Sequence, residues 1–133
     1  MGTTARVTTG ADLPCEVELE AGDSVRTMVF DHAGELSDGD AGPSSTQAVS
    51  AALAACTAVT LRIYAERKDW SLDGLDVEVE TTYDGPNPSL FKVKIGWPEQ
   101  LGPDQVERLE RIAGKCPVHR LVTEATSVEL ESG

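Results

Sequence analysis

Hydrophobic and polar residues alternate along much of the first thirty positions of the chain. Val17 and Leu19 are separated by glutamates, and the alternation resumes around Val25 and Phe30 after an Ala-Gly-Asp turn. A period of two is typical of a strand that has one buried face. The pattern therefore predicts two or three antiparallel strands within residues 6–31.

The pattern changes in the next segment. Residues 31–43 are rich in Gly, Asp and Ser and have no apolar period, which predicts a long loop and a candidate wall for a site. Ser44 is followed three positions later by Gln47, the spacing of a capping box at a helix start. We expect a helix that runs to about Arg67. Its first half, residues 48–59, is small and apolar on nearly every face, which predicts burial on all sides.

Two further alternating segments follow the long helix. Residues 75–83 and 91–97 are separated by a turn rich in Gly, Pro and Asn, which predicts a β-hairpin. Lys92 and Lys94 of the second segment can then face the acidic residues of the first segment across the hairpin.

The last third of the chain is mostly helical in pattern. Pro103 precedes apolar residues spaced three and four apart up to about Gly114, and Pro117 opens a further helical turn. Residues 126–130 have the pattern of a strand. This order of elements predicts one α+β domain over residues 1–133, with antiparallel sheets, a long buried central helix and a second helical pair.

Charge narrows the range of partners. The formal net charge of −12 arises from 23 acidic and 11 basic residues. Such a surface repels phosphate backbones and anionic lipid head groups, so we expect neither nucleic acid nor a membrane as a partner. The N-terminus lacks the apolar core of a signal peptide, and the longest apolar-rich stretch, residues 48–58, is too short to span a bilayer. These features predict a cytoplasmic protein in a reducing environment.

Three widely spaced cysteines argue against a structural disulfide framework. Cys116 precedes Pro117, a residue favoured at the first helical position, so its thiol is expected at a helix N-terminus that can stabilise a thiolate. Lys115 and Arg120 add positive charge nearby in the sequence. The alternative is that Cys116 is simply a small residue where two helices meet.

Cys56 lies in the middle of the Ala-rich helix, where a free cysteine most often packs as a small hydrophobe. Burial raises the pKa of a thiol unless a base or a cation comes from elsewhere in the fold. Thr60, one helical turn later, could donate a hydrogen bond to the sulfur. The local sequence leaves the reactive and the packing interpretation open.

Cys15 and His119 are the remaining candidates for thiol or metal chemistry. Cys15 has no cation or helix terminus nearby in the sequence, so we assign it no role. His119 follows Cys116 in a Cys-x-x-His spacing, but a structural zinc site needs four ligands, and Cys56 and His32 are the obvious extras. We therefore expect no metal and no cofactor.

Three segments stand in a specific order and spacing. They are the Gly-Pro-Ser-Ser run at residues 42–45 that leads into the Ala-rich helix around Cys56, the strand pair after it, and Ile-Ala-Gly-Lys-Cys-Pro-Val-His at residues 112–119. From about Arg6 onward the chain resembles the OsmC/Ohr family, named for osmotically inducible and organic hydroperoxide resistance proteins. The two cysteine motifs, 60 residues apart, are the specific part of this resemblance.

The resemblance implies an OsmC-like fold in an intertwined homodimer, with two sites close to the subunit interface. Cys56 would be the peroxidatic thiolate that attacks an organic hydroperoxide, and Cys116 would resolve the resulting sulfenic acid into a disulfide. An external dithiol would then reduce the pair. The implied function is a thiol-dependent peroxidase in oxidative stress defence.

Two departures from the family pattern concern activation of the thiolate. Where the family has a Glu in the first turn of the central helix, this chain has Gln47, which carries no negative charge. The family Arg of the N-terminal region has no counterpart in residues 8–12, so Arg26 and Arg6 are candidates by chain region alone.

Two other functions stay open. A dimer with little or no peroxidase activity could bind a small molecule in the same pocket, and Gln47 and the missing Arg favour this alternative. The other possible function is that of a protein interaction module. Only the acidic surface supports it, and solubility explains such a surface more simply. The enzyme requires the two thiols to be close, with Cα atoms within about 7 Å, and a cation near Cys56.

Overall fold

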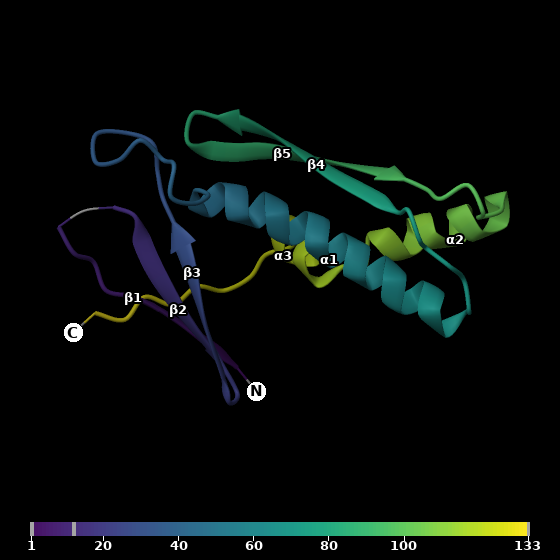
Figure 1. Ribbon diagram of the computed structural model, residues 1–133, viewed down its shortest axis with the longest axis horizontal. Coiled ribbons are helices and arrows are strands. Elements are labelled where there is room, and N and C mark those ends of the chain that lie inside the picture. The colour runs from purple at the N-terminus through teal and green to yellow at the C-terminus, as the bar shows by residue number, and fades with distance from the viewer. Residues whose placement is uncertain (1, 12, 133) are drawn as a thin grey trace. The chain divides into compact units, whose positions relative to one another are not determined.

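The computed structural model describes residues 2–11 and 13–132, and these form five strands and three helices (Figure 1). In chain order the elements are β1 (Thr3–Val7), β2 (Cys15–Ala21), β3 (Ser24–Phe30), α1 (Ser45–Arg67), β4 (Asp76–Asp84), β5 (Asn87–Gly96), α2 (Pro103–Ala113) and α3 (Pro117–Thr123). The chain divides into two compact units, Met1–Val49 and Ser50–Gly133. The antiparallel sheets and three helices confirm the predicted α+β class.

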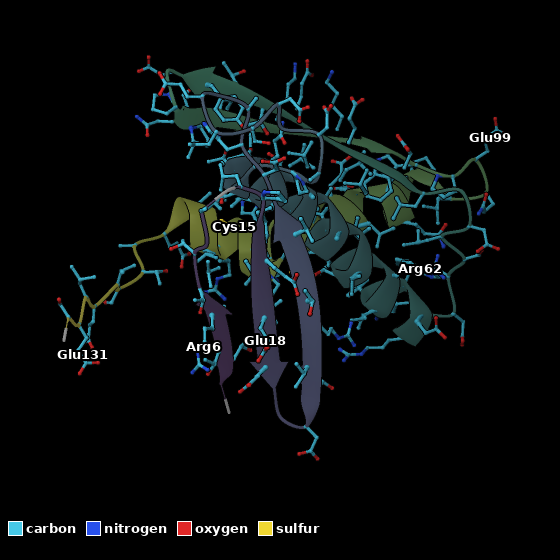
Figure 2. The ribbon with its side chains drawn as sticks, turned by 60° about the vertical axis from the view of Figure 1, so that its left-hand side comes forward. Arg6, Cys15, Glu18, Arg62, Glu99 and Glu131 are labelled. Atoms are coloured by element: carbon cyan, nitrogen blue, oxygen red, sulfur yellow. The ribbon has the colours of Figure 1, made fainter. Side chains whose placement is uncertain are left out.

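The first unit contains an antiparallel sheet in the order β1-β2-β3. Val17 pairs with Val7 on one side and Met28 on the other, whereas Glu18 pairs with Arg6 (Figure 2). Because directly paired residues share a face, the three apolar side chains lie on one face and Arg6 and Glu18 on the other. The prediction of two or three strands in this region is therefore confirmed.

The loop after β3 is organised around Asp31, which is 4% exposed. Its carboxylate accepts hydrogen bonds from the backbone N–H groups of His32 and Ala41 and from the Ser37 hydroxyl, at 2.8, 3.1 and 2.9 Å. The Asp31 N–H donates to the Pro43 carbonyl at 3.0 Å. The predicted loop is thus present, and one buried carboxylate ties its two ends together.

The start of α1 has the predicted capping box. Gln47 Oε1 accepts a hydrogen bond from the Ser44 N–H at 2.9 Å, and the Gln47 N–H donates to Ser44 Oγ at 3.2 Å. These bonds satisfy backbone groups that a helix start would otherwise leave without partners.

Within this single chain, α1 is buried along one stripe. The stripe consists of positions four residues apart: Leu53, Thr57, Leu61 and Ala65. The prediction that residues 48–59 are buried on all sides is wrong here, since Val49 and Val59 are 38% and 54% exposed. The physical reason is that the elements of residues 50–133 cover only one side of the helix.

The apolar character of α1 extends further than the sequence pattern indicated. By length and composition alone α1 could cross a membrane, and 22% of its apolar 18-residue window is buried in this chain. The prediction that no stretch is long enough is therefore wrong on length, because Val59, Leu61 and Ile63 continue the apolar run beyond residue 58.

In the second unit the β4–β5 ribbon runs along α1 (Figure 1). The core contains the buried residues Leu61, Ala65, Leu72 and Leu109, so α1 and α2 both contribute to it. The hairpin places Glu78 opposite Lys94 and Glu80 opposite Lys92. Lys94 Nζ lies 2.6 Å from Glu80 Oε2 and 3.8 Å from Glu78 Oε2, which confirms that lysines face acids across the hairpin.

The segment after α3 is not a strand. Residues 126–130 have no regular secondary structure, and Val128 and Leu130 are 93% and 96% exposed. The strand prediction is wrong for the single chain, because a strand needs a neighbouring strand for its backbone hydrogen bonds.

Candidate active site

The second unit brings two of the three cysteines into contact. Cys56 lies near the middle of α1, and Cys116 is the N-cap residue of α3, directly before Pro117. The two thiols lie close enough to shift each other's pKa, since Cys116 lowers the pKa of Cys56 and Cys56 raises that of Cys116. Two thiols 60 positions apart in the sequence are therefore neighbours, as a resolving step requires.

The two thiols differ in exposure. Cys116 is fully buried, with 0% of its surface exposed, whereas Cys56 is half-buried. Cys56 is therefore the more accessible of the two residues.

The environment of Cys56 favours its thiolate. Burial acts to raise the pKa of this thiol, but hydrogen bonds from the Cys116 thiol, the Val118 backbone and the Thr60 hydroxyl outweigh burial. The net direction is a lowered pKa. Each donor stabilises the anion, because hydrogen bonds to the charged form of an acid favour ionisation.

The environment of Cys116 favours the neutral thiol. Burial raises its pKa most strongly, and its hydrogen bond to Cys56 raises it further. The backbone hydrogen bonds of His119 and Val118 act in the opposite direction without reversing the shift. The two thiols therefore differ, with the thiolate favoured at Cys56 and the neutral thiol favoured at Cys116.

Gln47 and Arg26 both lie in the first unit. The Gln47 side-chain oxygen is engaged in the helix cap, so its observed role is structural. Arg26 pairs with Leu19 across β2 and β3, and this register puts it on the apolar face of the sheet, while Arg6 lies opposite Glu18. The predicted loop at residues 31–43 and Gln47 together line a small pocket of about 220 Å³.

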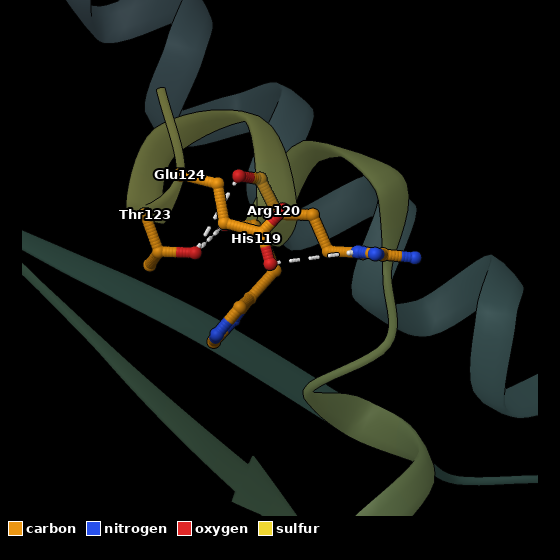
Figure 3. Close-up of polar contacts among 4 residues, drawn as sticks. All are labelled: His119, Arg120, Thr123 and Glu124. Carbon is orange, nitrogen blue, oxygen red and sulfur yellow. Dashed lines mark hydrogen bonds and ion pairs between the residues drawn. The ribbon is translucent and has the colours of Figure 1, made fainter. Parts of the chain in front are cut away.

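The His119 side chain extends from α3 toward the β-hairpin (Figure 3), and His119 lines a groove together with residues of β5. The groove has a volume of about 300 Å³, and its other walls include Leu53, Phe91, Val93 and Val122. The Thr123 hydroxyl donates to the His119 carbonyl at 2.8 Å, which holds the end of this short helix together. The groove is thus mostly apolar and has one imidazole in its wall.

Arg120, one of the two cations expected near Cys116, forms an ion pair with a different residue. Arg120 Nε lies 3.8 Å from Glu124 Oε1, four residues later on the same helix (Figure 3). Within residues 2–11 and 13–132, no three His, Cys, Asp or Glu side chains are placed to share a metal ion. Asp12, the last residue of the segment compared with the family Arg region, lies outside the described residues.

Sequence reasoning missed the Val118 backbone as a partner of Cys56. A main-chain group carries no residue-type signal, and its position depends on how α3 packs against α1. The Cys-Pro pair at residues 116–117 was a signal for the helix start, but not for the element that it faces.

Comparisons with known proteins identify the family and the fold. Residues 37–131 match the family model described as OsmC-like protein, and no curated protein matches the chain. One similar structure is a Psychrobacter arcticus protein that is provisionally described as an osmotic stress induced and detoxification response protein. It is 18% identical to this chain, with a TM-score of 0.71, and the match covers 89% of this chain and 86% of the Psychrobacter chain.

Two other solved structures have the same fold. An OsmC-like hydroperoxide resistance protein from Jannaschia is 19% identical, with a TM-score of 0.56 and coverage of 98% of this chain and 93% of its own. The organic hydroperoxide resistance protein OsmC of Legionella pneumophila is 21% identical, with a TM-score of 0.54 and coverage of 92% and 90%. The family model spans well over half of the residues of the present chain, so this chain belongs to the OsmC-like protein family.

Proposed function

We propose that the protein is a thiol-dependent peroxidase that reduces organic hydroperoxides through Cys56 and Cys116. The observation that carries the proposal is the asymmetry of the contacting pair. Cys56 is the more exposed thiol and has a lowered pKa, whereas Cys116 is buried and has a raised pKa. A nucleophile must be accessible and ionised, and a resolving thiol must wait nearby.

In the first step the Cys56 thiolate attacks the terminal oxygen of the hydroperoxide. The O–O bond breaks, Cys56 becomes a sulfenic acid, and the alkoxide leaves as an alcohol after it takes up one proton. Sulfur is oxidised by two electrons and the peroxide is reduced by two.

In the second step the Cys116 sulfur attacks the Cys56 sulfur, and the sulfenic hydroxyl leaves as water with the Cys116 proton. The product is a Cys56–Cys116 disulfide. An external dithiol then reduces this bond by thiol–disulfide exchange and restores both thiols. The sum is one hydroperoxide and one dithiol converted to alcohol, water and disulfide.

The exposed side of α1 supports a homodimer. Ala52, Ala55, Val59 and Ile63 form an exposed stripe on the side of the helix opposite Leu53, Thr57 and Leu61. An apolar stripe of small side chains allows close approach of another surface, and water is a poor partner for it. In our proposal each chain is a single domain of residues 1–133, and a second copy of the chain covers this stripe.

The proposed substrate class rests on an apolar groove in the same unit as the thiol pair and on the relatives of the chain. The groove beside α3 is mostly apolar, and two structural relatives are described as hydroperoxide resistance proteins. An organic hydroperoxide gains from burying its carbon chain, whereas hydrogen peroxide does not. Defence against oxidative stress in the cytoplasm is the role that we propose for this chemistry.

A kinetic test compares four proteins. The wild type, Cys56→Ser, Cys116→Ser and Cys15→Ser are mixed with an organic hydroperoxide and excess dithiol, and peroxide consumption is followed. We expect Cys56→Ser to fall to the background rate, Cys116→Ser to turn over more slowly than the wild type because the dithiol must reduce its sulfenic acid directly, and Cys15→Ser to match the wild type. Equal turnover by Cys56→Ser and wild type would overturn the proposal.

A small-molecule binding function is the second candidate. The observation that favours it is Gln47, whose amide is engaged in the helix cap where the family has a carboxylate for activation. The apolar groove with His119 in its wall is then the binding site. Saturable binding of an apolar carboxylate, combined with peroxide consumption at background in the wild type, would favour this function over the enzyme.

A further inference from the structure

Three elements of the second unit form the walls of the groove that contains His119. α1 contributes Leu53, β5 contributes Phe91 and Val93, and α3 contributes His119 and Val122. The volume of about 300 Å³ is that of a site for a small molecule, and it is too small for a peptide helix.

The chemistry of the lining selects the kind of small molecule. The sequence has 23 acidic residues, yet none of the described residues that line the groove is acidic. The Ser89 hydroxyl already donates to the Thr82 carbonyl at 3.1 Å, and the Thr123 hydroxyl donates to a carbonyl of its own helix at 2.8 Å. An imidazole N–H is a donor that a carboxylate or a sulfonate accepts. The groove therefore fits an apolar molecule with one anionic group.

The two helices that carry the proposed reactive thiols also line the groove. Leu53 lies three positions before Cys56 on α1, and His119 lies three positions after Cys116 at the start of α3. Residues three apart are neighbours on a helix surface. The groove therefore begins about one helical turn from each thiol.

α3 is the wall that is less firmly held. Leu53 of α1 is 1% exposed, whereas none of the seven residues of α3 is buried, and few buried contacts are typical of segments that move. An S–S bond of about 2 Å is shorter than any contact between two separate thiols. Its formation draws the start of α3 toward α1 and brings His119 toward Leu53, which narrows the groove.

We infer that the groove binds a small organic anion with an apolar body, and that this binding is coupled to the redox state of Cys56 and Cys116. The anion binds the dithiol form more tightly than the disulfide form. Because such coupling is reciprocal, the bound anion holds the pair in the dithiol form. The inference rests on the proposed function for the disulfide, but not on any peroxide.

The test uses the full chain with Cys15→Ser as background and anilinonaphthalene sulfonate, an apolar aromatic with one sulfonate, as the probe. Diamide forms the disulfide without a peroxide. The two thiols lose two protons and two electrons, the S–S bond forms, and the N=N bond of diamide takes up both protons and both electrons. Peptide mass spectrometry without reduction checks the link, and fluorescence titration gives the Kd of the probe for each form.

We expect a Kd about tenfold higher in the disulfide form, and no effect of diamide in Cys116→Ser, which cannot form the link. Equal Kd values in the two forms of the chain would overturn the inference. So would the absence of a Cys56–Cys116 disulfide after diamide.

Two neighbouring residues of α3 test the location. Val122 lines the groove and is 36% exposed, whereas Leu121 is 55% exposed and is not part of the lining. Val122→Asp should raise the Kd of the dithiol form about tenfold or more, since it places a carboxylate beside the sulfonate. Leu121→Asp should stay within about twofold. Equal losses in the two variants would contradict the groove as the site.

His119→Leu is a second variant, which also serves if circular dichroism shows that Val122→Asp does not fold. It should raise the Kd of the sulfonate about tenfold, because a hydrogen bond to a charged group is lost. The Kd of phenylnaphthylamine, the same aromatic without a sulfonate, should stay within about twofold. An equal change for both probes would contradict recognition of an anion.

Hydroperoxide consumption separates this inference from the proposed function. If diamide oxidation raises the Kd of the probe but the wild type consumes no hydroperoxide, the coupled site stands and the peroxidase fails. If the wild type turns over and the two forms bind the probe equally, the peroxidase stands and the coupled site fails.

Discussion

The two units of the chain differ in what holds them together. In Ser50–Gly133 the buried residues Leu61, Leu72 and Leu109 form a core, and Cys116 is fully buried. Among the described residues of Met1–Val49 only Asp31 is buried, and Val25 is 63% exposed. The contacting thiols therefore lie in the unit with its own core, whereas the β1–β3 sheet needs another surface to cover its apolar side chains.

Oxidation should stabilise only the second unit, and this is the largest effect that we expect. A disulfide between Cys56 and Cys116 closes a loop of about 60 residues, which contributes about 4 kcal/mol in the chain-entropy model. Hydrogen exchange of the reduced and oxidised protein should show increased protection in α1 and α3 and little change in β1–β3. Cys116→Ser, treated with the same oxidant, is the control. An equal increase in both units would contradict the difference between them.

A charge on the exposed stripe of α1 should separate the proposed dimer. Val59→Lys places an ammonium group where the second copy packs, and an unpaired buried charge weakens association by about a hundredfold or more. Light scattering after gel filtration should give the monomer mass. Leu90→Lys is the matched control, since Leu90 and Val59 are 56% and 54% exposed. If Leu90→Lys is monomeric and Val59→Lys is not, the dimer interface lies on β5 and the proposal for α1 is wrong.

The smallest effect should come from the loop after β3. Asp31→Asn removes one of the two carboxylate oxygens that accept three hydrogen bonds, so the loop at residues 31–44 should exchange hydrogen faster while the thiols keep their reactivity. Asp38→Asn is the control, because Asp38 accepts one exposed bond from Asp40. Faster exchange in both variants would remove the special role of Asp31.

The pH dependence of the loop follows from the same carboxylate. The bond from Ser37, followed by those from His32 and Ala41, lowers the pKa of Asp31 below its ordinary value of 3.8 despite burial. A group with a lowered pKa contributes stability that is present above the ordinary value and is lost as pH falls through the folded value. Loop exchange should therefore accelerate below about pH 4, whereas a loop that loosens between pH 5 and pH 7 would contradict this origin.

Most helices and strands could be predicted from local sequence patterns, since each pattern involves residues that are close together in the chain. The capping box at Ser44 and Gln47, the prolines at the starts of α2 and α3, and the lysine–glutamate pairs of the hairpin are all properties of short segments. The predictions that failed depend on what lies beside an element. Residues 126–130 have no strand partner, and α1 is covered on one side only.

The candidate residues could be selected from the sequence, but the different surroundings of the two thiols could not. Cys56, Cys116 and Thr60 could be selected from helix position and family resemblance. The direction of each pKa shift depends on burial and on the Val118 backbone, which only the packing of α3 against α1 creates. Gln47 could be seen as a cap and as a replaced catalytic acid, and the observed hydrogen bonds account for the cap.

The most direct test of the thiol pair is a disulfide map after one equivalent of an organic hydroperoxide is added to the reduced protein. Peptide mass spectrometry without reduction should identify a Cys56–Cys116 link, with Cys15 still free and no link in Cys56→Ser. Intact thiols at positions 56 and 116 after the hydroperoxide, or a link that involves Cys15, would contradict the proposed chemistry.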